Sequence, residues 1–101
     1  MIARTWHGVV RPEDARRYHE YLFATGVPEC RNTPGNRDVF VLQRTDAQGV
    51  HFLFISLWES WDAIRAFAGA DVDIARYFPE DERYLLEMEP NVTHYQVLEA
   101  P

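Results

Sequence analysis

The segment 51–58 constrains the fold more than any other part of this sequence, because both of its alternating sets of residues are largely apolar. In a β-strand, successive side chains point to opposite faces of the sheet. The two sets are His51, Leu53, Ile55 and Leu57, and Phe52, Phe54, Ser56 and Trp58. A single layer of helices covers only one face of a sheet. The chain therefore needs a second layer over the other face.

The length of 101 residues predicts a single domain over residues 1–101. A domain of this size buries a modest share of its surface, so a lone subunit is expected to be marginally stable. Yet 47% of the residues are hydrophobic and 14% are aromatic. Either the core is unusually aromatic, or part of the apolar surface is covered by a second chain.

Hydrophobic patterning predicts alternating strands and helices. A helix is expected to begin at Pro12 and to end near Gly26 and Pro28, and a second helix is expected over 60–68 with Ser60 as its cap. Trp61, Ile64, Phe67 and Ala68 would form its buried side. The remaining expectations are a tight turn at 33–36, a hairpin loop at 46–49, strands over 2–10, 38–45, 50–59 and 91–99, and short helical pieces over 71–77 and 79–88.

This order, β-α-β-β-α-β, predicts an α+β fold of the ferredoxin-like type with a four-stranded antiparallel sheet. Right-handed crossovers place both helices on one face of that sheet. The other face is then open, and a second copy of the same sheet is the simplest cover, which predicts a homodimer through the open face. The alternative is that the segment 79–88 folds over this face, although it is short for four strands.

Two stretches resemble the antibiotic biosynthesis monooxygenase (ABM) family of the dimeric α+β barrel superfamily. Residues 57–67 read LWESWDAIRAF, which is similar to the family motif of a strand that ends in Trp followed by a Ser-capped helix. Residues 33–36 read TPGN, which is similar to the Pro-Gly turn before the family's second strand. The segment 77–84 is longer than is usual there. The resemblance implies a single ABM-like domain that forms a dimeric α+β barrel.

The resemblance also implies an activity. Monooxygenases of this family use neither metal nor flavin, because the substrate itself supplies electrons to dioxygen. The expected function is oxidation of a small aromatic or polyketide-like phenol or hydroquinone, in an apolar cavity between the sheet and the helices. The family is functionally mixed, and fold alone does not fix function. The alternative is a non-catalytic dimer that binds a small ligand or serves a pathway as an accessory protein.

We expect no cofactor and no metal. The haem-degrading branch of the family carries an Asn, a Trp and a haem-ligating His at positions where this sequence has His7, Phe67 and Tyr77. The other histidines show no metal-ligand spacing with acidic residues or with Cys30. These differences argue against haem degradation.

His7 is the candidate catalytic base, because imidazole titrates near neutral pH. Tyr77 is the second candidate catalytic residue and would orient a ligand oxygen, while Phe67, Trp58 and Thr5 are candidate substrate-binding residues. Each has a plainer alternative: a satisfied or exposed His7, a Tyr77 with its hydroxyl at the surface, and a Trp58 that packs in the core.

Arg4 and Trp6 fall on the opposite strand face from His7 and are expected to point toward the partner subunit. An arginine on an apolar face needs a counter-ion, which Glu59 or Glu99 would supply.

The formal net charge of −6 excludes nucleic acid and anionic membranes as natural partners. The single cysteine, Cys30, cannot form an intrachain disulfide, which favours a reducing compartment. No apolar run has the length of a signal peptide core or of a membrane span. The expected location is the cytoplasm.

Overall fold

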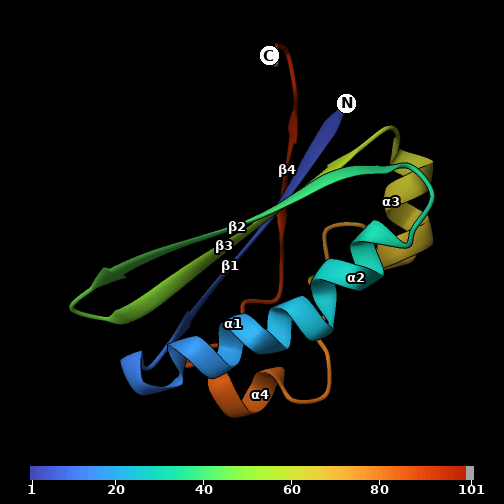
Figure 1. Cartoon of the computed structure of the whole chain (residues 1–101). Coiled ribbons are helices and arrows are strands. Elements are labelled where there is room, and N and C mark those ends of the chain that lie inside the picture. The colour runs from blue at the N-terminus through green and yellow to red at the C-terminus, as the bar shows by residue number, and fades with distance from the viewer. Residues whose placement is uncertain (100–101) are drawn as a thin grey trace.

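The computed structural model describes residues 1–99, which fold as one sheet with helices packed against one face (Figure 1). The strands are β1 (Ile2–Val10), β2 (Asn36–Asp46), β3 (Gly49–Trp58) and β4 (Thr93–Gln96). They form a four-stranded antiparallel sheet in the order β2-β3-β1-β4. The helices are the 3-10 turn η1 (Pro12–Asp14), α1 (Ala15–Ala24), α2 (Gly26–Arg31), α3 (Trp61–Ala68) and α4 (Asp81–Tyr84). The predicted α+β fold and its βαββαβ order are confirmed.

The family motif folds as the sequence predicts. Ser60 caps α3, because its side-chain oxygen accepts a hydrogen bond from the Ala63 amide at 3.1 Å. The turn before β2 requires Gly35, whose φ of +94° is rarely adopted by residues with a side chain. A Cβ atom at Gly35 would also lie 2.4 Å from the Cβ of Ala63. The glycine therefore lets this turn pack closely on α3.

Three predicted helical segments differ from the structure. The first helix is followed by a second, α2, and Pro28 does not end the helical region as predicted. Pro28 lies in the first turn of α2, where a backbone N–H makes no intrahelical hydrogen bond, so a proline is tolerated there. The segment 71–77 is not helical, since it pairs with residues 90–92 through the hydrogen bonds Ala75 N to Pro90 O and Val92 N to Asp73 O, both 2.9 Å. The expected helix over 79–88 is only the single turn α4.

The segment after α4 lies along β1 and does not cover the open face. Leu85 forms an isolated antiparallel bridge with Val10, and the Leu86 amide donates to the Val9 carbonyl at 2.9 Å. The α4 turn itself packs beside α1, where the Tyr84 and Tyr18 rings lie 5.6 Å apart (Figure 1). This placement rules out the alternative in which the segment 79–88 serves as a lid. Within residues 1–99, no helix is long and apolar enough to cross a membrane.

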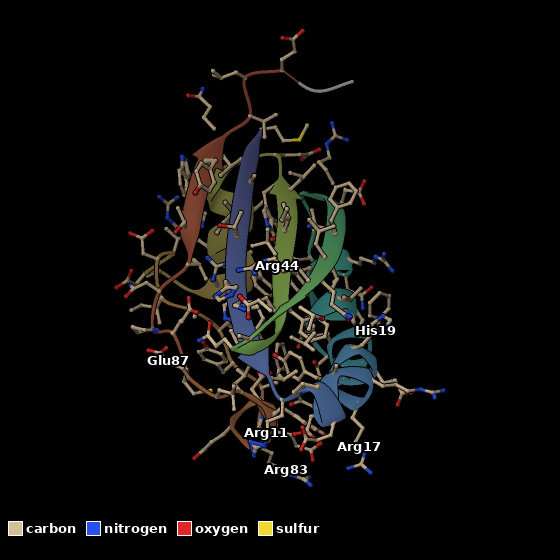
Figure 2. The ribbon with its side chains drawn as sticks, turned by 90° about the vertical axis from the view of Figure 1, so that its left-hand side faces the viewer. Arg11, Arg17, His19, Arg44, Arg83 and Glu87 are labelled. Carbon is tan, nitrogen blue, oxygen red and sulfur yellow. The ribbon has the colours of Figure 1, made fainter. Side chains whose placement is uncertain are left out.

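The two faces of the sheet have different surroundings. Figure 2 views the open face, with the helices behind the strands. The helix-covered face carries the core, which includes Val10, Phe52 and Trp58. On the open face Phe40 is 46% exposed and Leu42 is 49% exposed, next to half-buried residues of β3. In contrast to the prediction for α3, Trp61 is also exposed rather than part of the core.

Candidate functional site

A cavity lies between the helix-covered face of the sheet and the helices, where the sequence predicts a ligand site. Its volume is about 50 Å³, which is room for about four water molecules. Strands β1 and β3, helices α1, α2 and α3, and the segment 76–81 supply most of its walls. Aromatic and aliphatic side chains dominate them, with a few polar groups among them. The polar side chains are Arg4, Tyr18, Cys30, Ser56, Arg76, Tyr77 and Asp81.

Tyr18 and Asp81 form a buried pair at the end of the cavity where α1 meets α4. The Tyr18 hydroxyl donates to Asp81 Oδ1 at 2.8 Å, and the Phe78 amide donates to Asp81 Oδ2 at 2.7 Å. Burial raises the pKa of the Asp81 carboxyl, and burial together with the nearby Asp81 charge raises the pKa of Tyr18. Tyr18 thus keeps its proton, while Asp81 is the group here that is able to take one up.

The Tyr77 hydroxyl is held between Trp6, which lines the cavity, and the backbone of Glu89. Its hydroxyl accepts a hydrogen bond from Trp6 Nε1 at 3.1 Å and donates to the Glu89 carbonyl at 2.5 Å. Burial raises the pKa of the Tyr77 phenol, so the group stays protonated at neutral pH. The structure therefore places Tyr77 at the cavity, as the sequence predicts, and not with its hydroxyl on the surface.

His7 lies on the other side of the sheet, so its predicted place at the cavity is wrong. It points into the open face together with Thr5, whose hydroxyl donates to the Thr93 carbonyl at 3.0 Å, and neither residue lines the cavity. Arg4 and Trp6, which were expected to face a partner subunit, line the cavity instead. Strand alternation was read correctly. The prediction assigned the helix-covered face and the open face of β1 the wrong way round, because nothing in the sequence of β1 shows which face the helices cover.

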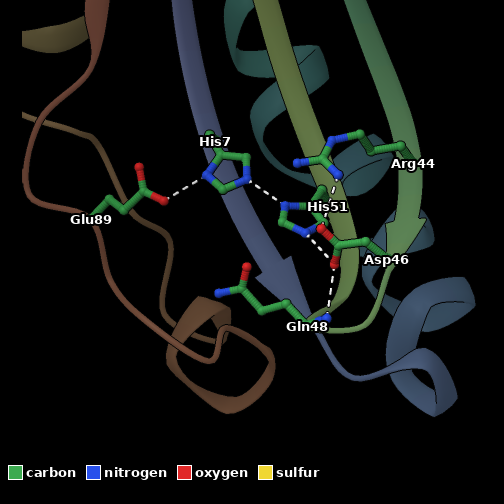
Figure 3. Close-up of polar contacts among 6 residues, drawn as sticks. All are labelled: His7, Arg44, Asp46, Gln48, His51 and Glu89. Carbon is green, nitrogen blue, oxygen red and sulfur yellow. Dashed lines mark hydrogen bonds and ion pairs between the residues drawn. The ribbon is translucent and has the colours of Figure 1, made fainter.

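The open face holds a chain of hydrogen bonds centred on His7 (Figure 3). His7 Nδ1 lies 2.6 Å from Glu89 Oε2, and His7 Nε2 lies 2.8 Å from His51 Nδ1. His51 Nε2 in turn lies 2.8 Å from Asp46 Oδ1. Each ring therefore links one carboxylate to the other ring.

Replacing His51 with Leu should raise the pKa of Asp46. The hydrogen bond from His51 is the main reason that the pKa of this carboxyl lies well below its ordinary range, ahead of the bonds from the Gln48 amide and Arg44. A depressed carboxyl pKa stabilises the fold above the ordinary pKa, and this stabilisation is lost as pH falls through the depressed value. His51→Leu should therefore lose less stability than the wild type between neutral and strongly acidic pH.

Carbon NMR titration of the Asp46 carboxyl measures this effect directly. The variant Arg44→Gln is the matched control and should shift the pKa less, because the Arg44 bond contributes less. An Asp46 pKa that does not change in His51→Leu would mean that the chain does not form in solution.

Phe67 and Trp58 occupy successive layers at one end of the cavity. Phe67 lines the cavity, as predicted, and its ring centroid lies 5.5 Å from that of Trp58. Trp58 is fully buried behind it and donates from Nε1 to Ser56 Oγ at 2.8 Å. The alternative in which Trp58 packs in the core therefore describes its position better than direct contact with a substrate.

Comparison with known proteins agrees with this fold and motif. The family model for antibiotic biosynthesis monooxygenase matches residues 8–72. The chain belongs to this family. No curated protein matches the chain. The family assignment thus rests on the central part of the domain, which contains α1, both long strands after it and α3.

Solved structures of ABM proteins share the fold at low sequence identity. A Nitrosomonas europaea protein assigned as an antibiotic biosynthesis monooxygenase is 14% identical with a TM-score of 0.70, over 98% of this chain and 100% of that chain. A Bacillus cereus protein with the same assignment is 18% identical with a TM-score of 0.65, over 100% and 94%. The haem degrader MhuD from Mycobacterium tuberculosis is 19% identical with a TM-score of 0.61, over 100% and 99%. These likenesses establish the fold alone.

Sequence reasoning missed several of the polar residues that line the cavity. Asp81 stands among acidic neighbours, and neither Asp81 nor Tyr18 is among the site residues that the sequence predicts. Arg4 was expected to pair with Glu59 or Glu99, but Glu59 pairs with Arg37 at 3.2 Å. A buried aspartate in an acidic run carries no distinct signal in a single sequence. Among residues 1–99, no group of three metal-ligating side chains comes together.

Proposed function

We propose that this ABM protein is a cofactor-independent monooxygenase that oxidises a small phenol or hydroquinone with dioxygen. The observation that carries the proposal is the convergence of an ionisable carboxyl and a tyrosine hydroxyl on an aromatic-lined cavity at the family's expected location. A pocket that is mostly apolar, with few converging polar groups and a perturbed carboxyl, is the usual form of a site for a small ligand.

In the proposed reaction one oxygen atom of dioxygen is added to the ring of the phenol, which becomes a quinone. The second oxygen atom is reduced to water and takes up the two hydrogen atoms that the phenol loses. The electrons come from the ring, so no redox cofactor is needed. Loss of the phenol proton makes the ring electron-rich, and Asp81 is the proposed base for that step in place of His7. Tyr77 would orient the ligand oxygen as a neutral hydrogen-bond partner. The aromatic walls keep bulk water away from the anion.

The size of the cavity limits the substrate to a small ring. A space of about 50 Å³ is below the roughly 150 Å³ of a cavity that binds benzene, so even a single-ring phenol requires displacement of wall side chains. Arg76 is exposed, whereas the other side chains that line the cavity are buried or half-buried, so Arg76 is the first candidate to move.

A panel of single-ring phenols and hydroquinones tests the proposal. We expect oxygen uptake above the rate in buffer, with a quinone product that carries one heavy oxygen atom when the dioxygen is isotopically labelled. Heat-denatured protein is the control for metal traces and for self-oxidation. If no compound reacts faster than in that control, the protein is a non-catalytic binding or accessory protein of the same fold.

We further propose that the protein is a homodimer through the open face of the sheet. Large apolar residues that are exposed or half-buried on that face are Phe40, Leu42, Leu53, Ile55, Leu57 and Tyr95. An apolar patch of this extent across four strands is uncommon on a monomer. The segment 79–88 packs beside α1 and along β1 and not over this face, and the family resemblance implies a partner of the same kind. Light scattering should therefore give about twice the 11.8 kDa mass of the chain.

A further inference from the structure

Arg4 is a buried cation whose acceptors are uncharged. The residue is 4% exposed, and its guanidinium donates to the carbonyl oxygens of Val72 and Ile74, the latter at 3.1 Å. Within residues 1–99, no carboxylate lies at ion-pair distance from it. Burial lowers the pKa of Arg4, although arginine stays charged in proteins. A buried charge without a counter-ion is costly, so the site favours a bound anion.

His94 does not supply the missing negative charge. Its Nε2 lies 3.2 Å from Arg4 Nη1, and its Nδ1 lies 3.3 Å from Asp73 Oδ1. Burial and the Arg4 charge lower the pKa of His94, so the ring is neutral and accepts a hydrogen bond from Arg4. Asp73 is exposed to solvent beyond the ring, where water screens its charge.

A second guanidinium lies at the same end of the cavity. The Arg76 Cζ atom lies 5.0 Å from the Phe67 ring centroid and 5.1 Å from that of Phe78, and Arg4 Cζ lies 5.9 Å from the same Phe67 ring. Both arginines line the cavity. Arg76 has one carboxylate partner, Glu29 at 3.4 Å on the outer side. Two cations that share one aromatic wall leave this end of the cavity electropositive.

Two tyrosine hydroxyls and a carboxyl also line the cavity, near Trp6. Tyr18 and Asp81 meet there, and Tyr77 lies beside them against Trp6. Arg4 and Trp6 are two residues apart on β1 and both line the cavity, so the side chains around Arg4 and those around Trp6 lie along the same strand face.

We propose that the cavity takes a hydroxyaryl carboxylate, with its carboxylate on Arg4 and Arg76 and its hydroxyl at Tyr18, Asp81 and Tyr77. The planar guanidinium forms paired hydrogen bonds with a carboxylate, and such charge-assisted bonds are about twice as strong as neutral ones. This inference rests on the proposed function in taking the same cavity as the substrate site, but it concerns binding and needs no turnover.

The test compares two ligands of nearly equal shape, para-hydroxybenzoate and para-hydroxybenzamide, which differ in charge. Titration calorimetry at neutral pH without oxygen measures both dissociation constants for the dimer or monomer as purified. We expect the wild type to bind the acid about 10- to 100-fold more tightly than the amide, the range for a hydrogen bond to a charged group. Equal affinity for the two, or no binding of either, would overturn the inference.

The variants Arg76→Gln and Arg4→Gln should each remove most of this preference. Arg65→Gln is the matched control, because Arg65 lies on α3 and pairs with the exposed Asp62 at 2.9 Å away from the cavity. If Arg4→Gln does not fold, Arg76→Gln still decides the question, since Arg76 is a surface residue. A preference for the acid that survives Arg76→Gln unchanged would contradict the proposed position of the carboxylate.

The outcomes separate this inference from the proposed function. Charge-dependent binding without any oxidation of phenols would leave the ligand class standing and remove the monooxygenase proposal. Oxidation of neutral phenols with no preference for the acid would do the reverse.

Discussion

Asp81→Asn is expected to lower phenol oxidation about 10²- to 10⁴-fold, the usual contribution of a positioned general base. Asp81 is the only carboxyl among the described residues that line the cavity, and it is 4% exposed. The asparagine side chain has a similar shape but cannot take up the phenol proton. Initial rates of quinone formation with the best substrate of the panel measure the loss. Glu80→Gln is the control, because Glu80 is the exposed neighbour and pairs with Arg83.

The pH dependence of the rate identifies Asp81 more sharply than the size of the loss. A base acts when ionised, so the rate should rise with pH through the pKa of Asp81, which burial places above that of an ordinary aspartate. The Tyr18 hydrogen bond lowers this pKa. Tyr18→Phe should therefore move the rising limb to higher pH. A profile that is the same in wild type and Tyr18→Phe would show that Asp81 is not the base.

Stability must be separated from catalysis at this position. Since the folded-state pKa of Asp81 is raised, its contribution to stability is fully present below the unfolded pKa and is lost as pH rises through the folded pKa. Asparagine has one acceptor oxygen for two buried donors, the Tyr18 hydroxyl and the Phe78 amide. The variant should lose about 1–3 kcal/mol of unfolding free energy for the donor left unpaired. Thermal melts recorded with the rate assays show whether the protein is folded where its activity is measured.

Local rules predicted much of the fold and part of the site. The alternation in 51–58, the Ser60 cap and the turn at Gly35 each depend on neighbours in sequence, and all three are as predicted. Tyr77 and Phe67 were placed at the cavity through the family motif, which fixes their distance from Trp58 along the chain.

What could not be predicted depends on contacts between distant segments. Arg4 and His7 lie on opposite faces of β1, and each of these faces carries both polar and apolar residues. The sequence of β1 therefore does not show which of the two residues lies under the helices. The partners that satisfy His7 lie 44 and 82 positions away, at His51 and Glu89. Nothing near His7 in the sequence indicates these partners, so a satisfied structural histidine looks the same as a catalytic one until the sheet is assembled.

Phe40→Glu is expected to dissociate the proposed homodimer. Phe40 lies on the open face and pairs in register with Ile55 on β3, which in turn pairs with Thr5 on β1. In a two-fold dimer through this face the substitution introduces one carboxylate from each subunit. Burial of an unpaired charge costs several kcal/mol, so the dissociation constant should rise about 100-fold or more. Light scattering over a concentration series should then show the mass of a single chain where the wild type is a dimer.

Gln43→Glu is the matched control for the dimer, because it adds the same charge to the same strand. Gln43 pairs in register with Phe52 and so lies on the opposite side of the sheet from Phe40, in an exposed position. It should leave the mass unchanged. In the isolated subunit Phe40 is already 46% exposed, so Phe40→Glu should cost the monomer little, and the variant should remain folded as judged by circular dichroism. A variant that unfolds as it dissociates would show that the subunit depends on its partner for stability. A Phe40→Glu variant that stays dimeric at the wild-type dissociation constant would mean that the subunits associate through another surface.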